Sequence, residues 1–201
     1  MKFILSILIF FNFSIAKVYA EETRQVDKHE HGVGELNIAT EGDVIEFEFM
    51  IPGADIVGFE YVAKSDADIA SIKKALQTLE NYENIFTLPK NSRCQLTEKQ
   101  VALKEDEDDH DDHEGHDDHD DHEEHDDHEG HDEHAEENHN EFYAKYSFEC
   151  GDIKAINNVE FPYFSTFPNS GELEVQFISS IGSVSFEVEA DEPSINIDGK
   201  I

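Results

Sequence analysis

The sequence predicts an α+β protein: a mostly antiparallel β-sheet domain with one main helix and a long, disordered insert rich in His, Asp and Glu. Three observations lead to this fold class. Short segments that alternate apolar and polar residues, the pattern of half-buried strands, recur along most of the chain. One segment beginning at Ser65 has helical apolar spacing instead. The stretch 105–139 has neither pattern and too few apolar residues to build a core.

The first twenty residues predict a cleavable secretory signal peptide. Lys2 gives a short positive region, and residues 3–15 form an apolar run broken only by Ser and Asn. The preferred cleavage point follows Ala20, a second follows Ala16, and an uncleaved N-terminal anchor is the alternative. No later segment approaches the roughly twenty apolar residues of a membrane span, so we expect no membrane insertion. Residues 21–201 are then predicted to form a single domain.

The first expected strands form a β-hairpin. Apolar residues alternate over 33–39 and again over 45–51, with a turn signal at 41–43 between them. Pro52 and Gly53 end the second strand. Further alternating segments predict strands near residues 94–103, 142–150, 173–177, 184–188 and 195–197. Six or more short strands with one helix favour a largely antiparallel sheet.

The main helix is predicted to begin after Ser65. The Ser65 hydroxyl can cap the helix, with Asp68 three residues on, and Asp66 suits the positive helix N-terminus. Its apolar face consists of Ile69, Ile72, Leu76 and Leu79. The pattern fades near residues 81–84, and residues 85–89 are expected to be irregular.

Acidic residues dominate the charge of the chain, whose formal net charge is −34. Of the 33 residues from Glu105 to Glu137, 21 are acidic and none is basic. Such a chain repels nucleic acid and anionic membrane surfaces, and it attracts cations. The remainder is only moderately acidic, so the sequence is that of an ordinary acidic domain with one extreme insert.

Two cysteines, Cys94 and Cys150, bracket this insert. An even number of cysteines in an exported chain predicts a disulfide. The cross-link would close a long loop and stabilise the fold by about 4 kcal/mol in the chain-entropy model. Two free buried thiols are the alternative, and zinc ligation by the pair is disfavoured because no Cys-x-x-Cys spacing occurs.

Histidine recurs at every third position within the insert. The nine members of this series are His110, His113, His116, His119, His122, His125, His128, His131 and His134, and His139 follows. Imidazole binds zinc, copper and nickel, and carboxylates also ligate zinc. A solvated acidic linker with incidental histidines is the alternative interpretation. The strict period favours binding of divalent transition metal, with Zn²⁺ as the expected ion and Cu²⁺ or Ni²⁺ binding in vitro.

The three-residue period argues against one rigid metal cage. On a helix the histidines would spiral around the axis, and in polyproline II geometry they would line one edge about 9 Å apart. Neither arrangement places four imidazoles on one tetrahedral ion, so we expect several overlapping sites of moderate affinity. The surrounding carboxylates concentrate divalent cations but also favour protonated histidine, so that protons compete with the metal.

A second, smaller histidine pair lies near the N-terminus of the mature chain. In an extended segment, His29 and His31 would lie on one face and could share a metal ion. Two histidines do not complete a zinc site, and the missing ligands could come from His139 or from the insert. A frayed N-terminus with two exposed histidines is the alternative.

Several short motifs, taken in their order, resemble the ZrgA family of periplasmic zinc-uptake proteins. They are His29-Glu30-His31-Gly32 with the following 34–39 segment, the Asp/His-rich insert, Phe164-Ser165-Thr166-Phe167-Pro168, and the segment 173–178 with Gly182. Ser183 after Gly182 departs from the Gly-Gln usual in the family. The resemblance implies a role in zinc capture or hand-over and favours His29 and His31 as metal ligands.

The leading functional prediction is a periplasmic zinc-binding protein that captures or buffers Zn²⁺ for uptake through a histidine-rich acidic loop. A zinc import system is its expected partner. A nickel- or copper-buffering protein that protects against metal excess is the alternative. We do not expect an enzyme, because the chain has no His-Glu-x-x-His sequence and a low-complexity insert cannot preorganise a metal-bound water.

Overall fold

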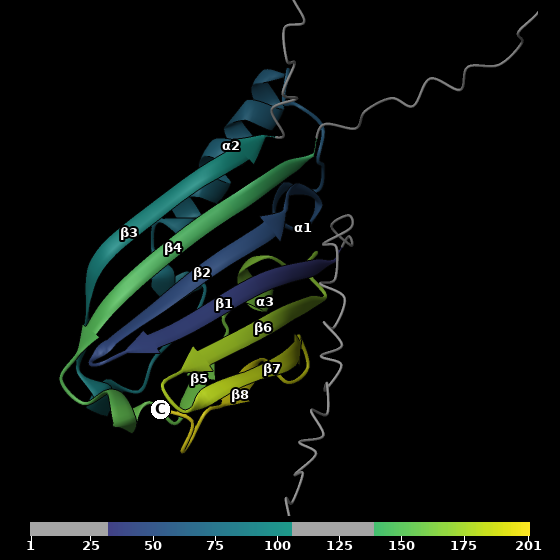
Figure 1. Cartoon of the computed structure of the whole chain (residues 1–201). Coiled ribbons are helices and arrows are strands. Elements are labelled where there is room, and N and C mark those ends of the chain that lie inside the picture. The colour runs from purple at the N-terminus through teal and green to yellow at the C-terminus, as the bar shows by residue number, and fades with distance from the viewer. Residues whose placement is uncertain (1–31, 106–138) are drawn as a thin grey trace, which may run out of the picture.

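A computed structural model describes residues 32–105 and 139–201. Its main feature is a six-stranded sheet with the strand order β3-β4-β2-β1-β6-β7 (Figure 1). The strands are β1 (Val33–Glu41), β2 (Val44–Pro52), β3 (Cys94–Glu105), β4 (Asn140–Cys150), β6 (Glu172–Ser179) and β7 (Gly182–Glu189). The predicted signal peptide and the histidine series of the insert lie outside the described residues, so the predicted disorder of the insert stays a prediction.

The sheet is mixed, because β1 and β6 run parallel while every other neighbouring pair is antiparallel. The prediction of a mostly antiparallel sheet is therefore confirmed, with one parallel pair that it did not foresee. A parallel pair needs a long crossover connection. Here the crossover contains β2, β3, β4 and the helices, so the two strands are far apart in sequence and their pairing leaves no local signal.

The main helix, α2 (Asp66–Leu79), begins where the sequence predicts. The Ser65 hydroxyl oxygen accepts a hydrogen bond from the Asp68 backbone N–H at 3.1 Å. The predicted apolar face is wrong at Ile69, whose residue surface is 51% exposed, whereas Ala75 and Leu79 are buried. Burial is confined to the C-terminal half of α2, so the apolar spacing extends one turn beyond the part of the helix that packs on the core.

Smaller elements complete the fold. They are the helices α1 (Gly53–Val57) and α3 (Tyr163–Thr166), the 3₁₀ turns η1 (Tyr82–Asn84), η2 (Lys90–Ser92) and η3 (Ile153–Ala155), and a two-stranded sheet of β5 (Asn158–Glu160) and β8 (Ser194–Asn196). The sequence predicts β8 from the alternating Ile195 and Ile197 but does not predict β5, in which Val159 is the single apolar residue. Within the described part of the chain, no helix is both long and apolar enough to cross a membrane.

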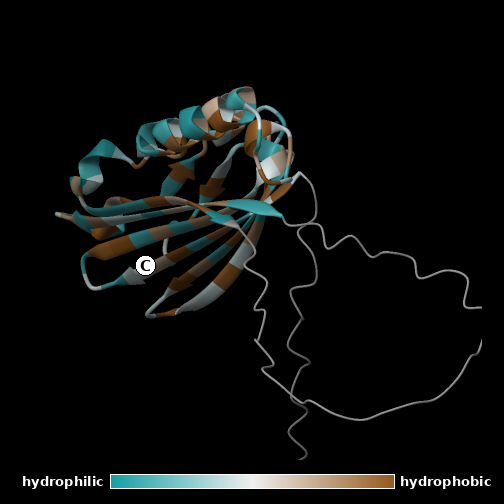
Figure 2. Ribbon diagram, turned by 90° about the horizontal axis from the view of Figure 1, so that it is seen from above, coloured by the Kyte–Doolittle hydropathy of each residue, from teal (hydrophilic) through white to brown (hydrophobic). Residues whose placement is uncertain are grey.

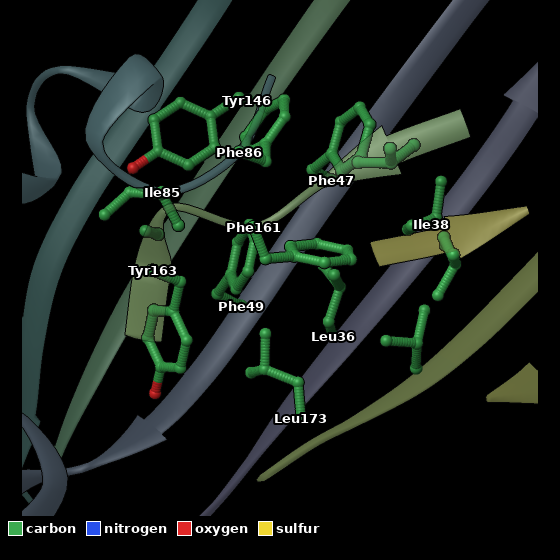
Figure 3. Packing of buried hydrophobic residues seen from close by; sticks show 14 of the residues in the cluster. Leu36, Ile38, Phe47, Phe49, Ile85, Phe86, Tyr146, Phe161, Tyr163 and Leu173 are labelled. Carbon is green, nitrogen blue, oxygen red and sulfur yellow. The ribbon is translucent and has the colours of Figure 1, made fainter. Parts of the chain in front are cut away.

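The core lies between one face of the large sheet and the helices, which Figure 2 shows gathered on a single side. Alternate residues of the strands point into it, among them Leu36, Ile38, Phe47 and Phe49 (Figure 3). Phe86, from the segment predicted to be irregular, is fully buried and stacks on Phe47 with ring centroids 4.1 Å apart. Irregular backbone thus supplies a central aromatic side chain of the core.

Candidate metal-binding end of the sheet

The strand directions bring four chain segments to one end of the sheet. Since β1 and β4 both run antiparallel to β2, both begin where β2 ends. Strand β3 also ends there, with Glu105 paired to Asn140. We call this the insert end, marked by Val33, Pro52, Glu105 and Asn140. Only β2 separates β1 from β4, and a strand spacing of about 4.8 Å puts their backbones roughly 10 Å apart.

His139, which directly precedes β4, is the only histidine among the described residues. Its Nδ1 atom lies 2.8 Å from the Glu60 carboxylate Oε2, and the side chains are 32% and 10% exposed, respectively. With Nδ1–H donating to the carboxylate, Nε2 carries the lone pair that a metal ion requires. A carboxylate on Nδ1 is a common means of orienting a histidine that binds metal through Nε2.

Backbone contacts fix the segment 59–61 against the start of β4. The Asn140 N–H donates to the Glu60 carbonyl at 2.9 Å, and the Asn140 side-chain amide donates to the Tyr61 carbonyl at 2.7 Å. Gly53 permits this close packing. A Cβ atom at Gly53 would lie only 2.6 Å from the Phe59 carbonyl oxygen and 2.9 Å from that of Asn140. The corner that holds His139 beside Glu60 is thus built from several independent contacts.

A second carboxylate holds the other chain segment that enters the insert end. Asp55 of α1 is 2% exposed, and its Oδ1 atom accepts a hydrogen bond from the Gly32 N–H at 2.8 Å. Ser170 donates to its Oδ2 atom at 3.2 Å and also hydrogen-bonds the Tyr163 hydroxyl. Burial raises the pKa of Tyr163, so this phenol is neutral at physiological pH. The Asp55 contacts fix the residue that follows His31 in the sequence.

The opposite end of the β3–β4 pair carries the predicted disulfide. Cys94 and Cys150 are bonded and pair directly across the two strands, which excludes free thiols and zinc ligation by this pair. Around them, Arg93 donates to the Gly151 carbonyl at 2.9 Å, and the Cys150 N–H donates to the Asp43 carbonyl at 2.8 Å. We call this the disulfide end. It lies a full strand length away from the insert end.

The structure describes one of the predicted metal ligands, His139. His29, His31 and the nine histidines of the insert lie outside the described residues, so their ligand roles stay predictions. Within 32–105 and 139–201, no three His, Cys, Asp or Glu side chains lie close enough together to hold a metal ion. A metal site that uses His139 would therefore need its other ligands from outside the described residues.

Sequence reasoning missed Asp55 and Glu60. Both are acidic residues in a very acidic chain, and both lie in the short connection between β2 and α2. Nothing in their local sequence distinguishes them from solvent-exposed acids. Their importance comes from contacts with Gly32 and His139, which are distant in sequence.

Comparison with known proteins supports the prediction that the chain has a zinc-related function. A family model described as "ZrgA family zinc uptake protein" matches residues 28–197. The chain belongs to the ZrgA family. The match begins one residue before His29 and ends one residue after β8, so it spans both histidine regions and the whole sheet. A search of curated proteins finds no match. Membership of ZrgA confirms the resemblance seen in the short motifs and links the chain to zinc uptake.

Proposed function

We propose that this ZrgA protein is exported to the periplasm, where it captures or buffers Zn²⁺ for import. The acidic histidine series from His110 to His134 provides most of the binding capacity. His29, His31 and His139 supply further ligands at the insert end. The protein acts by binding and releasing its cargo, not by catalysis.

The observation that supports this proposal is the position of the described residues that flank the histidine-bearing segments. Gly32, Glu105 and His139 all lie at one end of the sheet. The chain passes from Gly32 into β1, from Glu105 out of β3, and from His139 into β4, all at the insert end. Zinc sites in proteins are commonly built by four ligands from separate chain segments. Membership of a zinc-uptake family supports the choice of metal.

The same membership argues against the nickel or copper alternative, since the family description names zinc uptake. Imidazole ligands would still bind Cu²⁺ and Ni²⁺ in vitro, because copper and nickel form stable complexes with nitrogen ligands. Expression separates the two roles. A protein for import should increase under zinc starvation, whereas a protein for protection should increase under metal excess.

The test is a zinc titration by calorimetry with a competing chelator. It compares the full mature chain with a variant in which a Gly/Ser segment of equal length replaces residues 106–138. We expect the mature chain to bind more than one zinc ion and the variant to lose most of that capacity. An unchanged stoichiometry in the variant would refute the histidine series as the main reservoir.

Exchanging only the nine histidines for Gln provides the matched control. This variant keeps the length and every carboxylate of the insert, so it separates imidazole ligation from simple attraction of cations by acidic residues. We expect it to lose the chelator-resistant zinc while retaining weak, salt-sensitive binding.

A further inference from the structure

We propose that Glu60 is a positioning residue that fixes His139 as an oriented metal ligand. The inference rests on the proposed zinc binding and deepens it, because it separates one preset imidazole from the repeated histidines of the insert. Glu60 itself does not touch the metal. It acts by selecting the His139 tautomer and holding the ring in place.

The geometry between the two side chains supports this role. The Glu60 Oε2 atom lies 2.8 Å from Nδ1 of His139, and only 10% of the Glu60 side chain is exposed. A shielded carboxylate that accepts from Nδ1–H leaves Nε2 to bind the metal. With 32% exposure, the His139 ring reaches the surface at the insert end.

The backbone around the pair keeps both partners in place without using either side chain. Asn140 bonds the carbonyl groups of Glu60 and Tyr61, and Gly53 packs directly on Asn140. These contacts should survive when only the Glu60 carboxylate is changed. The carboxylate can therefore be tested separately from the fold of the corner.

A carboxylate in the large sheet provides the matched control. Glu46 of β2 lies within hydrogen-bonding distance of Lys145 at 2.9 Å and accepts from the Ser147 hydroxyl at 3.0 Å. It lies between the buried residues Ile45 and Phe47 and so faces the outer side of the sheet, where it contacts Lys145 and Ser147. Glu46→Ala removes one negative charge and one ion pair, as Glu60→Ala does. It therefore shows how much of any change in zinc affinity comes from lost charge or lost structure alone.

The experiment measures zinc affinity in the full mature chain by calorimetry with a competing chelator. Glu60→Ala should weaken the tightest zinc-binding step by about 10-fold or more, the usual effect of removing a carboxylate that orients a metal-binding histidine. Glu60→Gln should fall between Glu60→Ala and the wild type, since its amide oxygen can still accept from Nδ1–H. Glu46→Ala should leave this step unchanged.

A double-mutant comparison decides whether Glu60 acts through His139. In a His139→Ala background, Glu60→Ala and Glu60→Gln should each have no further effect on the tightest step. An equal loss of affinity with and without His139, or a wild-type affinity in the Glu60→Ala protein, would overturn the proposal. If Glu60→Ala does not fold, Glu60→Gln gives the same comparison.

The tautomer provides a readout that a merely structural role would not affect. In metal-free protein labelled with [¹⁵N]histidine, the His139 signals are those absent from His139→Ala. They should report a proton on Nδ1 in the wild type and a mixed or reversed tautomer in Glu60→Ala. An Nδ1-protonated ring in Glu60→Ala would contradict the assignment. Total zinc capacity, measured in the same titrations, tests the histidine series separately, so failure of one proposal does not imply failure of the other.

Discussion

The two ends of the β3–β4 pair are held by different chemistry. At the disulfide end, Cys94 and Cys150 are covalently linked next to the Arg93–Gly151 hydrogen bond. At the insert end, hydrogen bonds from His139 and Asn140 to Glu60 hold the start of β4 against the segment 59–61. The disulfide end is fixed by a covalent bond between two cysteines. The insert end instead combines the shielded Glu60 carboxylate with His139, the histidine that it contacts.

This difference indicates that the two ends of the strand pair have different roles. A disulfide stabilises mainly by restricting the unfolded chain, and it does so wherever along the pair it lies. Polar contacts fix the orientation of particular side chains, at the cost of being individually weak. We therefore expect removal of the disulfide to affect stability more than zinc binding, and removal of the Glu60 carboxylate at the insert end to show the reverse order.

The largest expected effect on stability comes from removing the covalent bond. A Cys94→Ser, Cys150→Ser double variant should lose about 2–5 kcal/mol of unfolding free energy, as measured by urea denaturation. Under conditions in which the variant is folded, its zinc stoichiometry should match that of the wild type. A loss of zinc sites at full folding would show that the disulfide end also organises the metal ligands.

The next largest effect is expected at the buried Asp55 carboxylate. Asp55→Ala leaves the Gly32 N–H and the Ser170 hydroxyl without this acceptor and should cost about 1–3 kcal/mol. Because Asp55 holds Gly32, which directly precedes β1, hydrogen exchange at the start of β1 should also increase. Faster exchange near the disulfide end alone would contradict the assigned role of Asp55.

Alkaline pH should lower the unfolding free energy through Tyr163, which lies near the insert end. Burial raises its pKa above the ordinary value of about 10, so the folded state keeps this phenol neutral while the unfolded state ionises. The stabilisation is fully present below pH 10 and is lost as the pH increases further. At pH 11 the loss should be about 1 kcal/mol. Denaturation of wild type and Tyr163→Phe at pH 8 and 11 measures it, and the variant should lose less.

The smallest effect on stability is expected from the insert itself. Replacing residues 106–138 with a Gly/Ser segment of equal length should change the unfolding free energy by less than about 0.5 kcal/mol, because the insert has almost no apolar surface to bury. Thermal denaturation of the metal-free proteins provides the measurement. Loss of a cooperative transition would show that the insert belongs to the core.

The sequence by itself determined the elements whose signals are local. Alternation located β1, β2, β4 and the central part of β6, and the Ser65 cap located the start of α2. The bracketing cysteines predicted the disulfide, and the histidine period predicted metal binding before the family match supported zinc. Apart from the cysteines, which are 56 positions apart, each of these patterns reports the environment or chemistry of residues that are close together in the chain.

Only the tertiary structure decided which distant segments meet. It paired β1 with β6 in parallel, left Ile69 exposed at the outer end of α2, and brought Glu60 to His139 across 79 positions of sequence. Periodicity indicates that a side chain is buried or exposed, but it does not identify its partner. Partners depend on strand order and on the close approach at Gly53, where backbone atoms of three segments leave no room for a side chain.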